Sequence, residues 1–122
     1  MRKKLYYLST CTTCERIMQE LKIKKYNFEL QDIKSVPITA AQLDEMEKMS
    51  GSYESLFSRI ALKFRAWKLN EQQLTEKDYK KYILEEYTFL KRPVFILNDK
   101  IFIGNSAKNI DAVARELKVL GS

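Results

Sequence analysis

The chain has 122 residues, 45% of them hydrophobic, and its 22 basic and 16 acidic residues give a net charge of +6 at pH 7. This length suits one domain with a real core. No apolar run approaches the ~20 residues of a membrane span, and the first one is too short for a signal peptide, so we expect a cytoplasmic protein. Histidine is absent and both cysteines fall in one short motif. These features argue against a secreted disulfide scaffold, and we expect no metal site.

The excess of basic residues favours anionic partners such as oxyanions, nucleic acid or acidic protein surfaces. The lysines are scattered along the sequence and form no single stripe. A solvated basic surface is therefore the simplest interpretation, and direct binding of nucleic acid is not expected. The run Lys22-Ile23-Lys24-Lys25 is interpreted as the C-terminal end of a helix, where cations are favoured.

The first third of the chain predicts a βαβ unit. Residues 4–8 form an apolar run typical of a strand, and a helix follows Cys11 and extends to about Leu21. Residues 26–31 then alternate apolar and polar side chains, which predicts a second strand. A helix that links two strands in this way implies parallel pairing and a right-handed crossover.

The middle of the chain, about residues 38–90, predicts only helices. Thr39 and Gln42 match a capping box, and Gly51 stands where that helix should end. Thr75 is expected to cap a later helix. Short helices are expected over residues 53–67, with three aromatic side chains packing inward: Phe57, Phe64 and Trp67.

The last third predicts two strands and a helix. The apolar runs 94–97 and 100–103 are joined by Asn98-Asp99, a plausible two-residue hairpin turn, and a final helix begins near residues 106–109. The predicted fold class is therefore α/β. It is a thioredoxin-like mixed sheet of four strands flanked by helices, with an all-helical insertion between the βαβ and ββα halves of a single domain spanning residues 1–122.

The motif Cys11-Thr12-Thr13-Cys14 lies where the first strand ends and the first helix begins. A C-x-x-C motif in this position is typical of a redox pair, although two small buried hydrophobic side chains are the alternative. Free N–H groups and the helix dipole favour a thiolate there. A helix terminus contributes about 0.3–2 kcal/mol, whereas moving a cysteine pKa from about 8.5 to about 6 takes roughly 3.4 kcal/mol. We therefore expect a further cationic or hydrogen-bonding group to converge on Cys11.

Three blocks carry a family resemblance. They are Tyr7-Leu8-Ser9-Thr10-Cys11-Thr12-Thr13-Cys14-Glu15-Arg16, Leu56-Phe57-Ser58-Arg59 with Lys63-Phe64-Arg65, and Phe89-Leu90-Lys91-Arg92-Pro93-Val94. In this order and spacing the chain resembles the arsenate reductase (ArsC) family, including its Spx and YffB-like branches. The resemblance implies a thioredoxin-like core with a helical insertion, and it places Cys11 at the nucleophile position. It also implies that Arg92 faces Cys11 and that Pro93 follows a cis peptide bond and is a structural residue of the site.

Arg92 is the first candidate for the missing cation, because a guanidinium is always protonated and holds oxyanions through paired donors. Arsenate reductases proper carry a basic triad, whose second member falls near Arg59. The third should lie in the last hairpin, where Asn105 supplies no cation. Arg65 is more simply structural. Cys14 is absent from one-cysteine reductases and resembles the Spx side of the family.

Two functions follow from the resemblance. The first is a thiol–disulfide oxidoreductase in which Cys11 attacks arsenate or a disulfide and Cys14 resolves the intermediate. It would need no bound cofactor, but an external reductant, either thioredoxin or glutathione with glutaredoxin. The alternative is an Spx-like redox-switched regulator that binds the C-terminal domain of the RNA polymerase α subunit. Gly51 matches a glycine of that binding surface, or simply closes its helix.

Overall fold

The computed structural model of the protein describes residues 1–121. The chain divides into two compact units. One is built from residues 1–36 together with the segment from Arg92 onward, and the other is Pro37–Lys91. The first unit contains the four strands and both cysteines, whereas the second is helical apart from an isolated β-bridge between Phe57 and Leu90.

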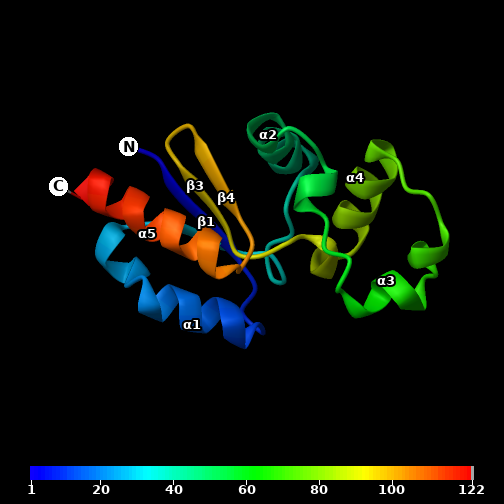
Figure 1. The fold of residues 1–122 in the computed structure, drawn as a ribbon, viewed down its shortest axis with the longest axis horizontal. Helices are drawn as coiled ribbons and strands as arrows, with labels where there is room; N and C mark the ends of the chain where they lie inside the picture. The colour runs from blue at the N-terminus through cyan, green and yellow to red at the C-terminus, as the bar shows by residue number, and fades with distance from the viewer. Residues whose placement is uncertain (122) are drawn as a thin grey trace. The chain divides into compact units, whose positions relative to one another are not determined.

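The first unit is a mixed sheet with helices packed on it (Figure 1). Its elements are β1 (Lys3–Tyr7), α1 (Thr12–Glu20), the 3₁₀ helix η1 (Ile23–Tyr26), β2 (Glu29–Asp32), β3 (Val94–Leu97), β4 (Lys100–Ile103) and α5 (Ala107–Gly121). The strand order is β2-β1-β3-β4, with β1 parallel to β2 and antiparallel to β3, which pairs antiparallel with β4. The predicted βαβ and ββα halves are therefore confirmed.

Both α1 and α5 pack on the same face of this sheet. Leu5 of β1 and Phe95 of β3 are fully buried in a cluster that also draws side chains from both helices. The cluster consists of Leu5, Ile17, Ile23, Phe95, Leu97, Val113 and Leu117. Because the cluster ties α1 to the sheet, it fixes the position of the helix that carries the cysteines.

The second strand begins later than its pattern predicts. It starts at Glu29, not at residue 26, because Tyr26 ends η1 and Asn27 has a left-handed backbone with φ of 60°. Lys22 is left-handed as well, with φ of 54°. The basic run 22–25 therefore lies in this irregular connection and not, as the sequence suggested, at the C-terminal end of α1.

The second unit consists of α2 (Ala40–Ser50), α3 (Leu62–Ala66), α4 (Glu76–Glu85) and the three-residue 3₁₀ helices η2 (Glu54–Leu56), η3 (Leu69–Glu71) and η4 (Tyr87–Phe89). The capping box of Thr39 and Gln42 is confirmed, as is the cap at Thr75, which pairs with Asp78. Gly51 follows α2 with φ of 100°, a backbone conformation that glycine adopts without strain. Local sequence thus set both ends of α2.

The aromatic packing of this unit differs in one place from the expectation. Phe57 is fully buried, but Trp67 is 39% exposed. Its indole still packs against the fully buried Phe89, with ring centroids 5.4 Å apart. Trp67 therefore contacts buried aromatic rings while part of its own surface stays exposed.

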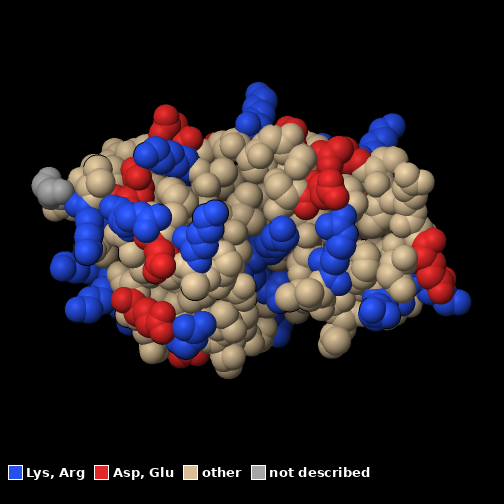
Figure 2. Space-filling model, in the orientation of Figure 1, with Lys and Arg blue, Asp and Glu red and all other residues tan. Residues whose placement is uncertain are grey.

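Lysines and arginines are interspersed with acidic side chains over the face of the molecule shown in Figure 2. Among residues 1–121, no helix combines the length and apolar character needed to cross a membrane.

Candidate active site

The C-x-x-C motif lies at the junction between β1 and α1. Cys11 is the residue before the first turn of α1, with an extended backbone at φ −95° and ψ 109°. Its N–H donates to the carbonyl of Leu8 at 3.0 Å, and its carbonyl accepts from the N–H of Glu15 at 3.2 Å. These two bonds tie Cys11 to both the end of the strand and the start of the helix.

The environment of Cys11 favours its thiolate. Partial burial raises the pKa of the Cys11 thiol, but opposing influences outweigh it and hold the pKa below its ordinary value. In order of size these come from the backbone N–H and then the thiol of Cys14, the positive charge of Arg92 and the N–H of Thr13. The sulfur makes no capping hydrogen bond of standard geometry. We therefore attribute the effect of the N–H groups to electrostatic attraction at the start of the helix.

Cys14 has the opposite character. It is fully buried, and this burial raises the pKa of its thiol to about 11, with the thiolate of Cys11 adding to the increase. Hydrogen bonding with the Leu8 backbone and the charge of Arg92 oppose the increase without cancelling it. Between the two values of pKa, Cys11 is ionised while Cys14 keeps its proton.

Arg92 lies in the same unit as the cysteines, immediately before β3. Its Nε atom is buried, and its positive charge lowers the pKa of both thiols. The peptide bond between Arg92 and Pro93 is cis. The carbonyl of Pro93 accepts a hydrogen bond from the N–H of Gly104 at 2.9 Å, which joins this turn to the end of β4.

Asp32 supports the motif from the neighbouring strand, a role that the sequence analysis missed. Its Oδ1 accepts from the N–H of Ser9 at 3.1 Å and from that of Lys34 at 3.2 Å, and Oδ2 accepts from the hydroxyl of Ser35 at 3.2 Å. β1 and β2 are parallel, so the residues that follow them meet at one edge of the sheet. The sequence signal that could have indicated this role is an aspartate at the end of the second strand.

We expect Asp32→Asn to lower the free energy of unfolding by about 1 kcal/mol at pH 7. The asparagine side chain carries no negative charge and keeps only one of the two oxygens that accept these hydrogen bonds. Desolvation raises the pKa of Asp32, but the hydrogen bonds with Ser9, Lys34 and Ser35 outweigh it and the net pKa is lowered. The stabilisation is therefore present above about 3.9, the unfolded-state value, and is lost as pH falls through the lower folded-state value. Urea unfolding between pH 2 and pH 7 measures it, with Asp99→Asn as an exposed control. A difference that persists unchanged at the lowest pH contradicts this role.

Arg59, the other proposed anion-binding residue, forms hydrogen bonds within the helical unit. Arg59 belongs to the helical unit, where its guanidinium donates to the Glu54 carboxylate at 2.8 Å and to the Tyr79 hydroxyl at 2.7 Å. Its pKa is raised chiefly by Glu54. Asn105 is exposed beyond β4 and brings no charge. Arg92 is therefore the cation that lowers the pKa of both thiols. Within residues 1–121, no cluster of three or more potential metal ligands occurs.

Comparison with solved structures defines the fold. A YffB protein superimposes with a TM-score of 0.78 at 24% identity, covering 93% of this chain and 96% of that one. An arsenate reductase from Vibrio cholerae gives 0.76 at 12% identity, with coverage of 94% and 97%. An arsenate reductase related protein from Brucella melitensis gives 0.71 at 21% identity, with coverage of 92% and 93%. The protein therefore has a thioredoxin-like fold.

A match to a protein-family model assigns the chain to a family within this fold. The sequence model of the ArsC family matches residues 6–113, which include both cysteines and Arg92. The chain belongs to the ArsC family. Among curated proteins, none matches the sequence significantly.

Proposed function

We propose that this protein is a cytoplasmic thiol–disulfide oxidoreductase, with Cys11 as nucleophile, Cys14 as resolving thiol and Arg92 as anion-binding residue. The supporting observation is the separation of the two thiol pKa values. Burial raises the pKa of Cys14 to about 11, whereas the helix start and Arg92 keep that of Cys11 below normal. A thiolate beside a guanidinium can both bind an oxyanion and attack it.

Arsenate is the proposed substrate, and the electrons balance over two steps. The Cys11 thiolate first attacks arsenic(V) and displaces a protonated oxygen as water, which forms a sulfur–arsenic bond. Cys14 then loses its proton and attacks the Cys11 sulfur. The sulfur–arsenic bond breaks with its electron pair on arsenic, so arsenite leaves and a Cys11–Cys14 disulfide forms. An external reductant, either the two thiols of thioredoxin or two molecules of glutathione with glutaredoxin, returns the two electrons.

The state of Cys11 influences the pKa of Cys14. Burial is the largest cause of the raised Cys14 pKa, but the hydrogen bond to Cys11 and its negative charge also raise it. Once the Cys11 sulfur is bonded to substrate, the thiolate charge of Cys11 no longer contributes to the raised pKa of Cys14, while the effect of burial remains.

An arsenate-dependent turnover assay tests the proposal. Wild-type protein, supplied with thioredoxin and its reductase or with glutathione and glutaredoxin, is expected to oxidise the reductant in proportion to the arsenite formed. Cys11→Ser is expected to abolish turnover, because a hydroxyl at this position stays protonated. Absence of arsenite with both reductants contradicts arsenate as the substrate.

The second candidate is a redox-switched regulator that binds the RNA polymerase α subunit, and Gly51 is the residue that favours it. Gly51 is exposed, and a Cβ added there would meet no atom within 4 Å, so a partner has room to approach. Its positive φ gives it a structural role in ending α2 as well. Capture of the α subunit that changes with the redox state of the cysteines, combined with no arsenate turnover, would favour this function.

A further inference from the structure

An apolar groove lies between α1 and the edge strand β2. It has a volume of about 750 Å³, and all its lining residues fall between Tyr7 and Leu30, within the first unit. The apolar side chains that line it come from four segments of the chain: Tyr7, Leu8, Met18, Ile23 and Leu30. The groove is therefore formed without any contribution from the helical unit.

Leu30 is the most unusual of these residues. It pairs in register with Leu5, so it faces the same side of the sheet as the core cluster under α1. Leu5 is fully buried, but Leu30 is 47% exposed, because β2 is the edge of the sheet. Proteins usually protect an edge strand with charged side chains, whereas Leu30 extends a contiguous apolar lining to this edge, and such a surface is a candidate binding site.

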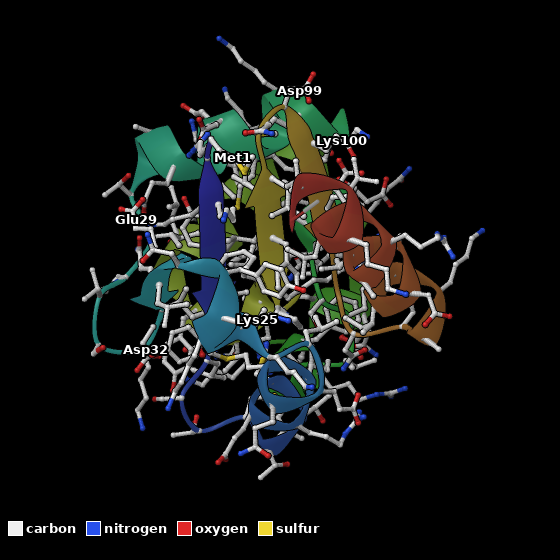
Figure 3. All side chains as sticks on the ribbon, turned by 90° about the vertical axis from the view of Figure 1, so that its left-hand side faces the viewer. Met1, Lys25, Glu29, Asp32, Asp99 and Lys100 are labelled. Carbon is white, nitrogen blue, oxygen red and sulfur yellow. The ribbon has the colours of Figure 1, made fainter. Side chains whose placement is uncertain are left out.

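Basic side chains from one short segment line the groove. Lys22, Lys24 and Lys25 line it with a single acidic residue, Glu15. All three lysines are exposed, and none forms an ion pair within residues 1–121. Figure 3 marks η1 by Lys25 and the ends of β2 by Glu29 and Asp32. The rim of the groove is thus suited to carboxylates.

The segment that leads from β1 to the redox motif forms part of the groove wall. Leu8 and Ser9 line the groove, and the carbonyl of Leu8 accepts the hydrogen bond from the N–H of Cys11. The groove is therefore joined to the redox motif through the backbone of this segment.

We propose that this groove is the docking site for an extended, acidic segment of a partner protein. An extended segment fits because, within residues 1–121, β1 is the only strand paired with β2, so the other edge of β2 can accept a further strand. Acidic side chains pair with the three lysines, and apolar ones cover Leu30. The binding does not require Cys11 to react, although the position suits a partner whose thiol or disulfide exchanges with the redox pair.

Peptide binding monitored by amide NMR tests the proposal. A short peptide of alternating valine and glutamate is expected to shift the signals of the groove residues, whereas a peptide of alternating valine and lysine is not. Changing Lys22, Lys24 and Lys25 together to glutamate is expected to weaken binding about tenfold or more. Leu30→Ser is expected to weaken it without affecting folding, because that side chain is half exposed.

The controls separate this site from general attraction by a basic protein. The matched variant changes to glutamate three lysines that do not line the groove: Lys48, Lys77 and Lys108. It alters net charge equally and should bind the acidic peptide nearly as well as wild type. Cys11→Ser should bind normally, so loss of redox activity leaves this result intact. Equal binding of both peptides, signal shifts elsewhere, or unchanged affinity in the groove variant overturns the proposal. So does tighter binding of a small carboxylate amphiphile, or self-association that buries the groove.

Discussion

Arg92→Ala is expected to raise the pKa of the Cys11 thiol and to reduce kcat/KM for arsenate by about tenfold to a hundredfold. The charge of Arg92 is one of the influences that lower this pKa. A hydrogen bond to a charged group contributes about 1.5–3 kcal/mol, which corresponds to that loss. Steady-state kinetics measure the turnover, and the pH dependence of alkylation by iodoacetamide measures the pKa.

A conservative variant separates the two roles of Arg92. Arg92→Lys keeps the positive charge but loses the planar pair of donors. We expect the pKa of Cys11 to stay near the wild-type value while KM for arsenate rises. Arg115→Ala removes an exposed arginine of α5 and serves as the matched control. If Arg92→Ala behaves like that control, the guanidinium has no part in the site.

Cys14→Ser is expected to abolish formation of the intramolecular disulfide. Under mild oxidant the wild-type monomer should lose the mass of two hydrogens, because the Cys14 sulfur attacks oxidised Cys11. The variant should instead accumulate Cys11 as a sulfenic acid or as an adduct with an added thiol. Intact-protein mass spectrometry distinguishes these products.

Folding of the Cys14→Ser variant must be checked because this position is fully buried. A buried hydroxyl without a good partner costs about 1–3 kcal/mol, which thermal unfolding would detect. Cys11→Ser, which removes a thiol at a partly exposed position, is the control that separates loss of a thiol from disturbance of the core. Wild-type protein that stays fully reduced under oxidant, or a folded Cys14→Ser that still loses two hydrogens, contradicts the resolving role.

Local signals in the sequence were sufficient for most of the fold. The capping boxes at Thr39 and Thr75 act over three residues, and both are present. Hydrophobic periodicity located the strands on either side of Asn98-Asp99. The start of β2 could not be predicted this way, because residues 26–28 alternate like a strand while Asn27 takes a left-handed backbone directly after η1. The exposure of Trp67 was not predicted, because hydrophobicity alone does not show that α3, a helix of five residues, has no buried side chain.

The site was only partly predictable. The position of the cysteines followed from the junction of strand and helix, but the approach of Arg92 came from family resemblance, since the two segments are some eighty residues apart in the chain. Asp32 was missed because its role depends on the parallel pairing of β1 with β2. The anion-binding role of Arg59 stays a prediction, and its Nη2 donates hydrogen bonds to Glu54 and Tyr79.

The most direct test is the alkylation rate of each cysteine of the reduced wild-type protein as a function of pH, assigned by mass spectrometry. The account predicts that Cys11 reaches half its maximal rate below about 8.5, the ordinary cysteine pKa, while Cys14 stays unreactive until pH approaches 11. Midpoints for Cys11 at or above the ordinary value, or similar midpoints for the two thiols, would show that neither the start of α1 nor Arg92 holds Cys11 in its reactive form.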